Sequence, residues 1–235
     1  MAAIDQRIGE RREEVGSFQL ITSDIFFAAL GDWLQQLRSI DQRLLNANQL
    51  NQVLDSEWAV TELLQADSLK VRGVIDHQGV LQSAASVEAD AGALRIQWLA
   101  TAPQNLIYLE NPDRLAGASR ALMLYLVKES QDLGFQGRIE LVSLETSIEF
   151  YRKLGFSQRG GLLSLDPENA QSLLDQYGDT VMFAKFDTEE LDRLEAESGA
   201  VLAVPDQDAL RRRDDYKAKR MAEIETQKQE SATDQ

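Results

Sequence analysis

The chain has 235 residues, a mass of 26.3 kDa and a formal charge of −15, with 39 acidic and 24 basic residues. This acidity argues against a general nucleic-acid binder and against docking on anionic lipid, because both need clustered Lys and Arg. The absence of cysteine excludes disulfides, thiolate nucleophiles, zinc fingers and iron–sulfur clusters built by this chain. Its one histidine, His77, excludes a His-rich metal site.

The sequence predicts neither a secretory signal nor a membrane-spanning segment. Residues 1–16 are polar and charged, and they lack the apolar core of a secretory signal. No stretch approaches the run of about 18 apolar residues that a membrane-spanning helix needs. We therefore expect a soluble, cytoplasmic protein.

Hydrophobic periodicity predicts the secondary structure of the first half. A short strand is followed by two amphipathic helices with apolar residues spaced by three and four: residues 17–22, 25–37 and 44–64. The pattern then changes to three strands with tight polar connections, an antiparallel meander: residues 71–76, 80–88 and 94–102. His77 lies in the first of these connections, where an exposed turn is expected rather than a functional residue.

Helices and strands alternate in the second half. The predicted helices are 115–133, 146–153 and 167–177, and the predicted strands are 138–143, 162–165 and 180–186. After Phe186 the composition becomes charged and poor in apolar residues, which predicts an exposed helix or disorder. The expected organisation is a charged N-terminal segment, a globular domain and a charged tail, over residues 1–16, 17–186 and 187–235.

The residue pattern that indicates chemistry lies between Leu94 and Phe156. A predicted strand leads into a loop of small residues, 116–119, which opens the long helix. The first turn of a helix has unpaired amide hydrogens and the positive end of the helix dipole, so small residues there let the backbone approach a phosphate. Arg114 adds a charge-assisted contact. Close packing of the helix on the sheet is the alternative explanation.

Two motifs in this stretch resemble the GCN5-related N-acetyltransferase (GNAT) family. The family motif Gln/Arg-x-x-Gly-x-Gly/Ala is matched by Arg114, Gly117 and, imperfectly, Ser119. The family signature Phe/Leu-Tyr-x-x-x-Gly-Phe is matched by residues 150–156. The order of predicted elements also agrees over residues 17–186. The resemblance implies an α/β (α+β) GNAT acyl-CoA N-acyltransferase fold, with a mixed, mostly antiparallel central sheet of six to seven strands flanked by helices.

The resemblance also implies an acetyl-CoA-dependent N-acetyltransferase. It would transfer an acetyl group directly to a primary amine of a small molecule, a peptide N-terminus or a lysine, with acetyl-CoA as cosubstrate and no metal. Backbone groups of Leu99, Ala100 and Thr101 would pair with the pantetheine arm as an extra strand. Arg114 and a run of backbone amides would hold the pyrophosphate: Leu115, Ala116, Gly117, Ala118, Ser119 and Arg120.

Tyr151 takes the position of the family's general acid. A phenol is neutral at pH 7 and can give its proton to the departing thiolate. Packing of the last conserved helix on the sheet is the structural alternative for this side chain. Leu144 replaces an Asn with which many family members bind the cofactor arm, so Ser143 or Ser147 is expected either in that role or as a helix cap.

The general base stays unassigned. Gln97 and Trp98 lie where the family often has an acidic residue, and the candidates Glu88 and Asp90 have surface carboxylates as the alternative. These departures leave open a catalytically inactive GNAT-fold module that binds CoA or a protein partner through its tail, and an assembly protein as a third reading. The final strands are a candidate homodimer edge, and no nucleic-acid or membrane partner is expected.

Overall fold

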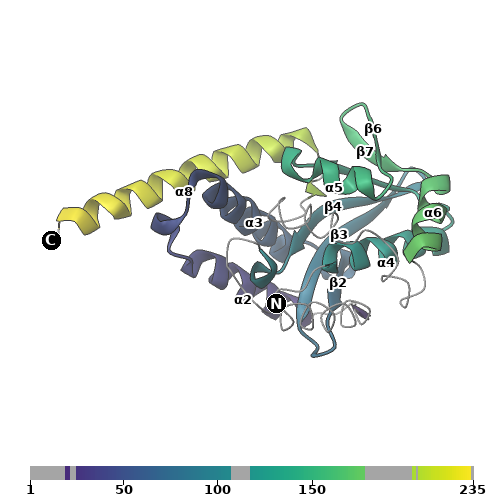
Figure 1. Ribbon diagram of the computed structural model, residues 1–235, viewed down its shortest axis with the longest axis horizontal. Helices are drawn as coiled ribbons and strands as arrows, with labels where there is room; N and C mark the ends of the chain where they lie inside the picture. Colours follow the sequence, from purple (N-terminus) through teal and green to yellow (C-terminus); the bar gives the residue numbers. More distant parts are fainter. Residues whose placement is uncertain (1–18, 22–24, 107–116, 178–202, 205, 234–235) are drawn as a thin grey trace, which may run out of the picture.

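The computed structural model describes residues 19–21, 25–106, 117–177, 203–204 and 206–233 (Figure 1). Three predicted site residues lie outside these ranges: Arg114, Leu115 and Ala116. The charged segment 1–16 and the predicted strand 180–186 lie outside them as well. None of the helices in the described ranges combines the length and the apolar character that a membrane crossing requires.

The five helices predicted between residues 25 and 177 are present, with ends that differ by up to three residues, and the tail predicted as an exposed helix or disorder also contains a helix. They are α2 (Ile25–Ser39), α3 (Ala47–Gln65), α4 (Ala118–Asp132), α5 (Ile148–Lys153), α6 (Pro167–Tyr177) and α8 (Gln207–Thr233). Short 3-10 turns lie at Gln42–Leu44, Ser68–Lys70, Pro103–Asn105 and Glu145–Ser147. A capping box fixes the start of α3, since Asn46 and Gln49 each donate a backbone N–H to the other's side chain at 3.0 Å.

One mixed sheet forms the centre of the molecule. Its strands are β1 (Gln19–Ile21), β2 (Val71–Ile75), β3 (Leu81–Asp90), β4 (Ala93–Thr101), β5 (Ile139–Ser143), β6 (Ser157–Arg159), β7 (Leu162–Leu165) and β8 (Ala203–Val204). Their order is β1-β2-β3-β4-β8-β5-β7-β6, with a further parallel pairing of β4 with β5. The predicted mixed, mostly antiparallel sheet flanked by helices is confirmed.

The described sheet has eight strands, whereas six to seven were expected. The difference includes β8, which comes from the predicted charged tail and lies between β4 and β5. Two residues of extended chain are too short to show a hydrophobic period, so the pattern from which strands were predicted does not find them. The tail therefore contributes to the sheet as well as forming a helix.

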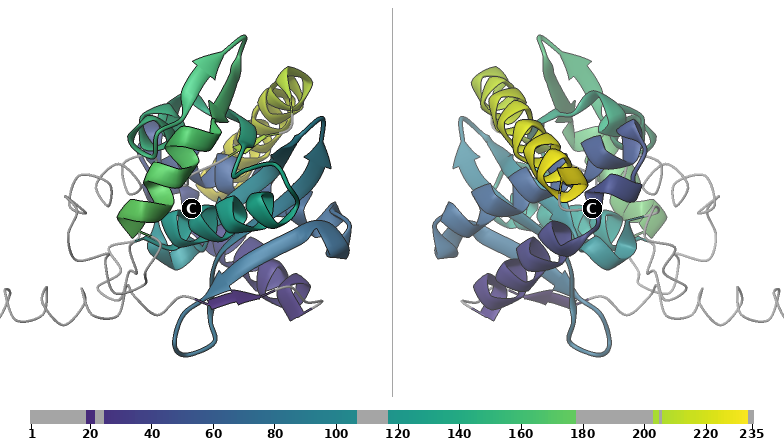
Figure 2. Two further views of the ribbon diagram at one scale, coloured as in Figure 1. Left: turned by 90° about the vertical axis from the view of Figure 1, so that its right-hand side faces the viewer. Right: turned by 90° about the vertical axis from the view of Figure 1, so that its left-hand side faces the viewer.

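Helices cover both faces of the sheet (Figure 2), and each face is packed by one apolar cluster. Residues of α4, α5 and α6 pack on one face, and residues of α2, α3 and α8 pack on the other. Successive side chains of β4 point to opposite faces of the sheet, so the strand contributes to both clusters. Leu99 belongs to the first cluster, and Trp98 and Ala100 belong to the second. Trp98 meets Trp58 of α3 edge to face, with ring centroids 4.9 Å apart, so both tryptophans are core residues.

Helix α8 lies alongside α3, and its C-terminal end extends away from the body (Figure 1). Acidic residues of α3 that are nearly inaccessible to solvent fix this position. Asp55 Oδ1 lies 2.9 Å from Lys217 Nζ and 3.7 Å from Arg213 Nε. Burial raises the pKa of Asp55 above its ordinary value, while Lys217 and Arg213 act in the opposite direction.

A second buried carboxylate, Glu57, joins the same two helices. Its Oε1 accepts hydrogen bonds from Tyr216 Oη at 2.7 Å and Arg38 Nε at 2.9 Å, and it lies 3.2 Å from Arg220 Nε. Burial and this carboxylate together raise the pKa of Tyr216 to about 12. We call the contacts of Asp55 and Glu57 with α8 the α3–α8 latch. The helix predicted to be exposed therefore packs on the chain's own body.

Candidate functional site

Strands β4 and β5 separate toward their carboxyl ends and leave room for an extended chain between them. Their direct parallel pairing is confined to Leu94 with Ile139 and Arg95 with Glu140. Farther along, β8 lies between the two strands and pairs with both. We call the space bordered by residues 99–101 of β4 and 142–143 of β5 the β4–β5 slot. Backbone hydrogen bonds from either border can hold an extended chain there.

Strand β4 leads from this slot to the N-terminus of α4. The hydroxyls of Thr101 and Ser119 share a buried hydrogen bond of 2.8 Å, which joins the last residue of β4 to the first turn of α4. Gly117 precedes the helix with a φ of 86°, a left-handed conformation that favours glycine. Glycine also provides no side-chain acceptor for the first-turn amides. The positive end of the α4 dipole therefore lies beside the slot.

Three groups hold the predicted cofactor residues that the structure describes: Leu99, Ala100 and Thr101 border the slot, residues 117–120 form the start of α4, and Ser147 precedes α5. All of these residues are buried. Burial of these side chains is compatible with the predicted contacts, because those contacts use mainly the backbone. Ser119, which stands where the GNAT motif has Gly or Ala, turns its hydroxyl to Thr101. The cofactor contacts themselves stay predictions.

Tyr151 is packed in the apolar cluster that also contains Leu99 and Ala118. Its side chain is fully buried, and its ring meets Phe150 and Phe156 edge to face at centroid distances of 5.5 and 5.3 Å. Within the described part of the chain its hydroxyl has no hydrogen-bond partner. Burial raises the pKa of Tyr151 above its ordinary value, so the phenol stays protonated at neutral pH. A buried, unpaired hydroxyl is costly unless something else pairs with it.

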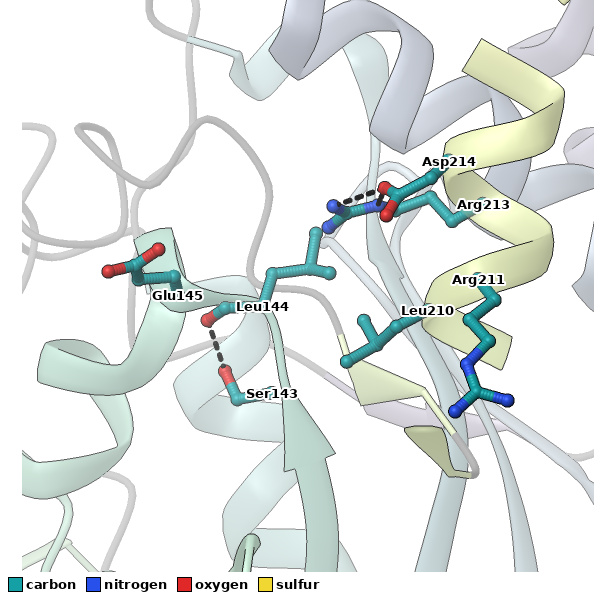
Figure 3. A pocket seen from close by; sticks show the side chains of 7 residues that line it. All are labelled: Ser143, Leu144, Glu145, Leu210, Arg211, Arg213 and Asp214. Atoms are coloured by element: carbon teal, nitrogen blue, oxygen red, sulfur yellow. Dashed lines mark hydrogen bonds and ion pairs between the residues drawn. The ribbon is translucent and has the colours of Figure 1, made fainter. Parts of the chain in front are cut away.

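The end of β5 borders a pocket of about 380 Å³ between this strand and α8 (Figure 3). It is lined by Ser143, Leu144, Glu145, Leu210, Arg211, Arg213 and Asp214. Ser143 donates its hydroxyl to the carbonyl of Leu144 at 2.9 Å, while Ser147 is buried at the start of α5 without a side-chain cap bond. Neither serine therefore caps α5 through its side chain.

The two candidate bases lie at the far end of the sheet from the slot. Glu88 forms an exposed ion pair with Lys70 at 2.7 Å, and Asp90 pairs with Arg95 at 2.9 Å. Strand register places Asp90 opposite Ala93, at the opposite end of β4 from Thr101. The alternative of surface carboxylates is therefore the observed one. His77 is exposed in the turn before β3. Asp76 Oδ1 stabilises this turn by accepting the backbone N–H groups of Gln78 at 2.8 Å and Val80 at 3.0 Å.

Sequence reasoning missed the residues that lie inside the slot. Ala203 stands opposite both Leu99 of β4 and Ser143 of β5, and Val204 stands opposite Val142. One signal was available, because residues 200–204 form an apolar run within a charged tail. Such a run predicts burial, yet nothing in the sequence indicates which strands it pairs with.

Two solved structures are similar to this chain. One is a protein from Lactobacillus plantarum described as an N-acetyltransferase, with 15% identity over 63% of this chain and 94% of that one, at a TM-score of 0.39. The other is the PaiA N-acetyltransferase from Thermoplasma acidophilum in complex with coenzyme A, with 14% identity over 63% of this chain and 96% of that one, at a TM-score of 0.40. No protein-family model and no curated protein sequence matches the chain.

Proposed function

We propose that this protein is an acetyl-CoA-dependent N-acetyltransferase that acts on a primary amine. The observation that supports this most directly is the β4–β5 slot, which ends at the N-terminus of α4. The pantetheine arm is an extended chain with amide groups, and it can pair with the backbone of Leu99, Ala100 and Thr101 as β8 does at Leu99. The diphosphate of the same molecule then reaches the positive end of α4.

The chemistry proposed for this site is direct transfer. The neutral amine attacks the thioester carbonyl, so a carbon–nitrogen bond forms and the carbon–sulfur bond breaks. The amine loses a proton to water or to a base, and the departing thiolate takes a proton from Tyr151. A bound thioester sulfur supplies the partner that the Tyr151 hydroxyl lacks in the described part of the chain. No covalent enzyme intermediate is required.

The test is release of free CoA thiol from acetyl-CoA in the presence of small primary amines and lysine peptides. We expect amine-dependent CoA release by the full chain, with the acetylated amine identified by mass spectrometry. The matched control is the full chain with Gly117→Val, in which a side chain occupies the proposed phosphate position. Equal CoA release with and without every amine, or in both chains, contradicts the proposal.

The occupied slot favours a second function, a GNAT-fold module without catalysis. Ala203 already pairs with Leu99, and Gln97 and Trp98 stand where a strand carboxylate is expected. A module of this kind would bind CoA without turnover, or would not bind it. The inner face of α8 is not available to a partner, because Tyr216 and Lys217 on that face bind Glu57 and Asp55 of α3.

A further inference from the structure

Strand β8 occupies the place that the proposed function assigns to the pantetheine arm. Ala203 is paired with Leu99 on one side and with Ser143 on the other, and Val204 is paired with Val142. An arm that pairs with β4 at Leu99 needs the same backbone groups. The two chains therefore cannot occupy the slot at Leu99 together.

In the described part of the chain, β8 makes only a few residue pairings in the slot. Its described part has two residues, whereas β3 and β4 have ten and nine and pair over most of their lengths. Local opening costs least where a segment makes few hydrogen bonds. β8 can therefore leave the slot while the rest of the sheet stays intact.

The α3–α8 latch keeps β8 close to the slot. Helix α8 begins at Gln207, three residues after β8 ends, and Asp206 accepts the Ala209 N–H at 2.7 Å. Lys217 and Tyr216 then bind the buried carboxylates of Asp55 and Glu57. Anchoring one end of a short chain raises its effective concentration at a neighbouring site. Loosening the latch should therefore lower the occupancy of the slot by β8.

We propose that β8 is an intramolecular competitor of the pantetheine arm, held in the β4–β5 slot by the α3–α8 latch. This inference rests on the proposed function. The chain alternates between a form closed by β8 and a form open to the cofactor. The apparent affinity for CoA is then lower than that of the open form by the fraction of molecules in which the slot is open.

The experiment is calorimetric titration of full-length variants with two probes, CoA and 3′-phosphoadenosine 5′-diphosphate. The second probe has the phosphates of CoA but lacks the pantetheine arm. Ala203→Pro removes a backbone N–H from β8 and disfavours pairing in the middle of a sheet. Lys217→Ala loosens the latch, and Lys219→Ala is its control, because Lys219 is exposed on the same helix.

We expect Ala203→Pro to bind CoA about 10-fold or more tightly than the natural chain, with unchanged affinity for 3′-phosphoadenosine 5′-diphosphate. Lys217→Ala should shift CoA affinity in the same direction, and Lys219→Ala should not. Equal or weaker CoA binding by both Ala203→Pro and Lys217→Ala overturns the competition while the proposed function stands. Failure of every variant to bind either probe overturns the proposed function, and the competition with it.

Discussion

Replacing Tyr151 by phenylalanine is expected to stabilise the fold and to lower turnover in the same protein. The hydroxyl is fully buried among aromatic and aliphatic side chains and has no hydrogen-bond partner in the described part of the chain. Removing a buried, unpaired hydroxyl should raise the free energy of unfolding by about 1 kcal/mol. Loss of the proton donor should lower kcat about 100-fold, with little change in cofactor affinity.

Urea unfolding and steady-state kinetics of the same preparation measure both effects. Tyr216→Phe is the matched control for stability, because the Tyr216 hydroxyl donates to buried Glu57 at 2.7 Å. That variant should lose stability, by about 1–2 kcal/mol. An unchanged kcat in Tyr151→Phe refutes the general-acid role, and a loss of stability shows that the hydroxyl has a partner in the folded chain.

The second large effect is expected at Gly117. Valine at this position must adopt a φ of 86° and places a branched side chain at the start of α4. The strain should cost about 1–2 kcal/mol of stability, as for other non-glycine residues in the left-handed region. The side chain should also keep a phosphate away from the first-turn amides, so we expect affinity for 3′-phosphoadenosine 5′-diphosphate to fall at least about 100-fold.

Gly134→Val separates strain from loss of the binding site. Gly134 follows the other end of α4, has a φ of 85°, and has open space where a Cβ would lie. Both variants should lose similar stability, measured by urea unfolding, while only Gly117→Val should lose nucleotide affinity, measured by calorimetry. Equal affinity in the two variants contradicts a phosphate site at the N-terminus of α4.

The parts of the fold predicted well from the sequence are those set by local patterns. The change of period at Val71 predicts the three-strand meander, and the polar turns before Leu81 and Ala93 separate its strands. The long second-half helix is also predicted, although it begins at Ala118 and not at Leu115. Gly117 sets that start through its left-handed backbone, because a residue in this conformation cannot continue a right-handed helix.

Long-range pairing explains what the sequence did not predict. Asp55 and Glu57 are buried because Lys217 and Tyr216, about 160 positions away in the chain, reach them from α8. Only a fragment of an apolar seam is visible in that helix, where Leu210 and Ile224 pack inward and Met221 is exposed. Charge pairs between distant helices leave no periodic signal. The position of β8 was not predicted either, because its pairing with β4 and β5 joins residues far apart in the chain.

The candidate site was also predicted only in its local parts. Family motifs placed Gly117 at the start of α4 and Tyr151 in α5, and the structure connects their neighbourhoods through one apolar cluster. The slot itself follows from the register of β4 with β5, which depends on two strands far apart in the sequence. The sequence left the general base unassigned, and in the structure the two candidates, Glu88 and Asp90, form surface ion pairs.

Amide hydrogen exchange with and without acetyl-CoA tests the central claim most directly. If the cofactor binds in the β4–β5 slot and at the start of α4, exchange should slow in residues 99–101 and 117–120. If it displaces β8, exchange should become faster in residues 203–204 in the same sample. Unchanged exchange in all three segments at saturating acetyl-CoA would contradict cofactor binding at this site, and slower exchange in residues 203–204 would contradict displacement of β8.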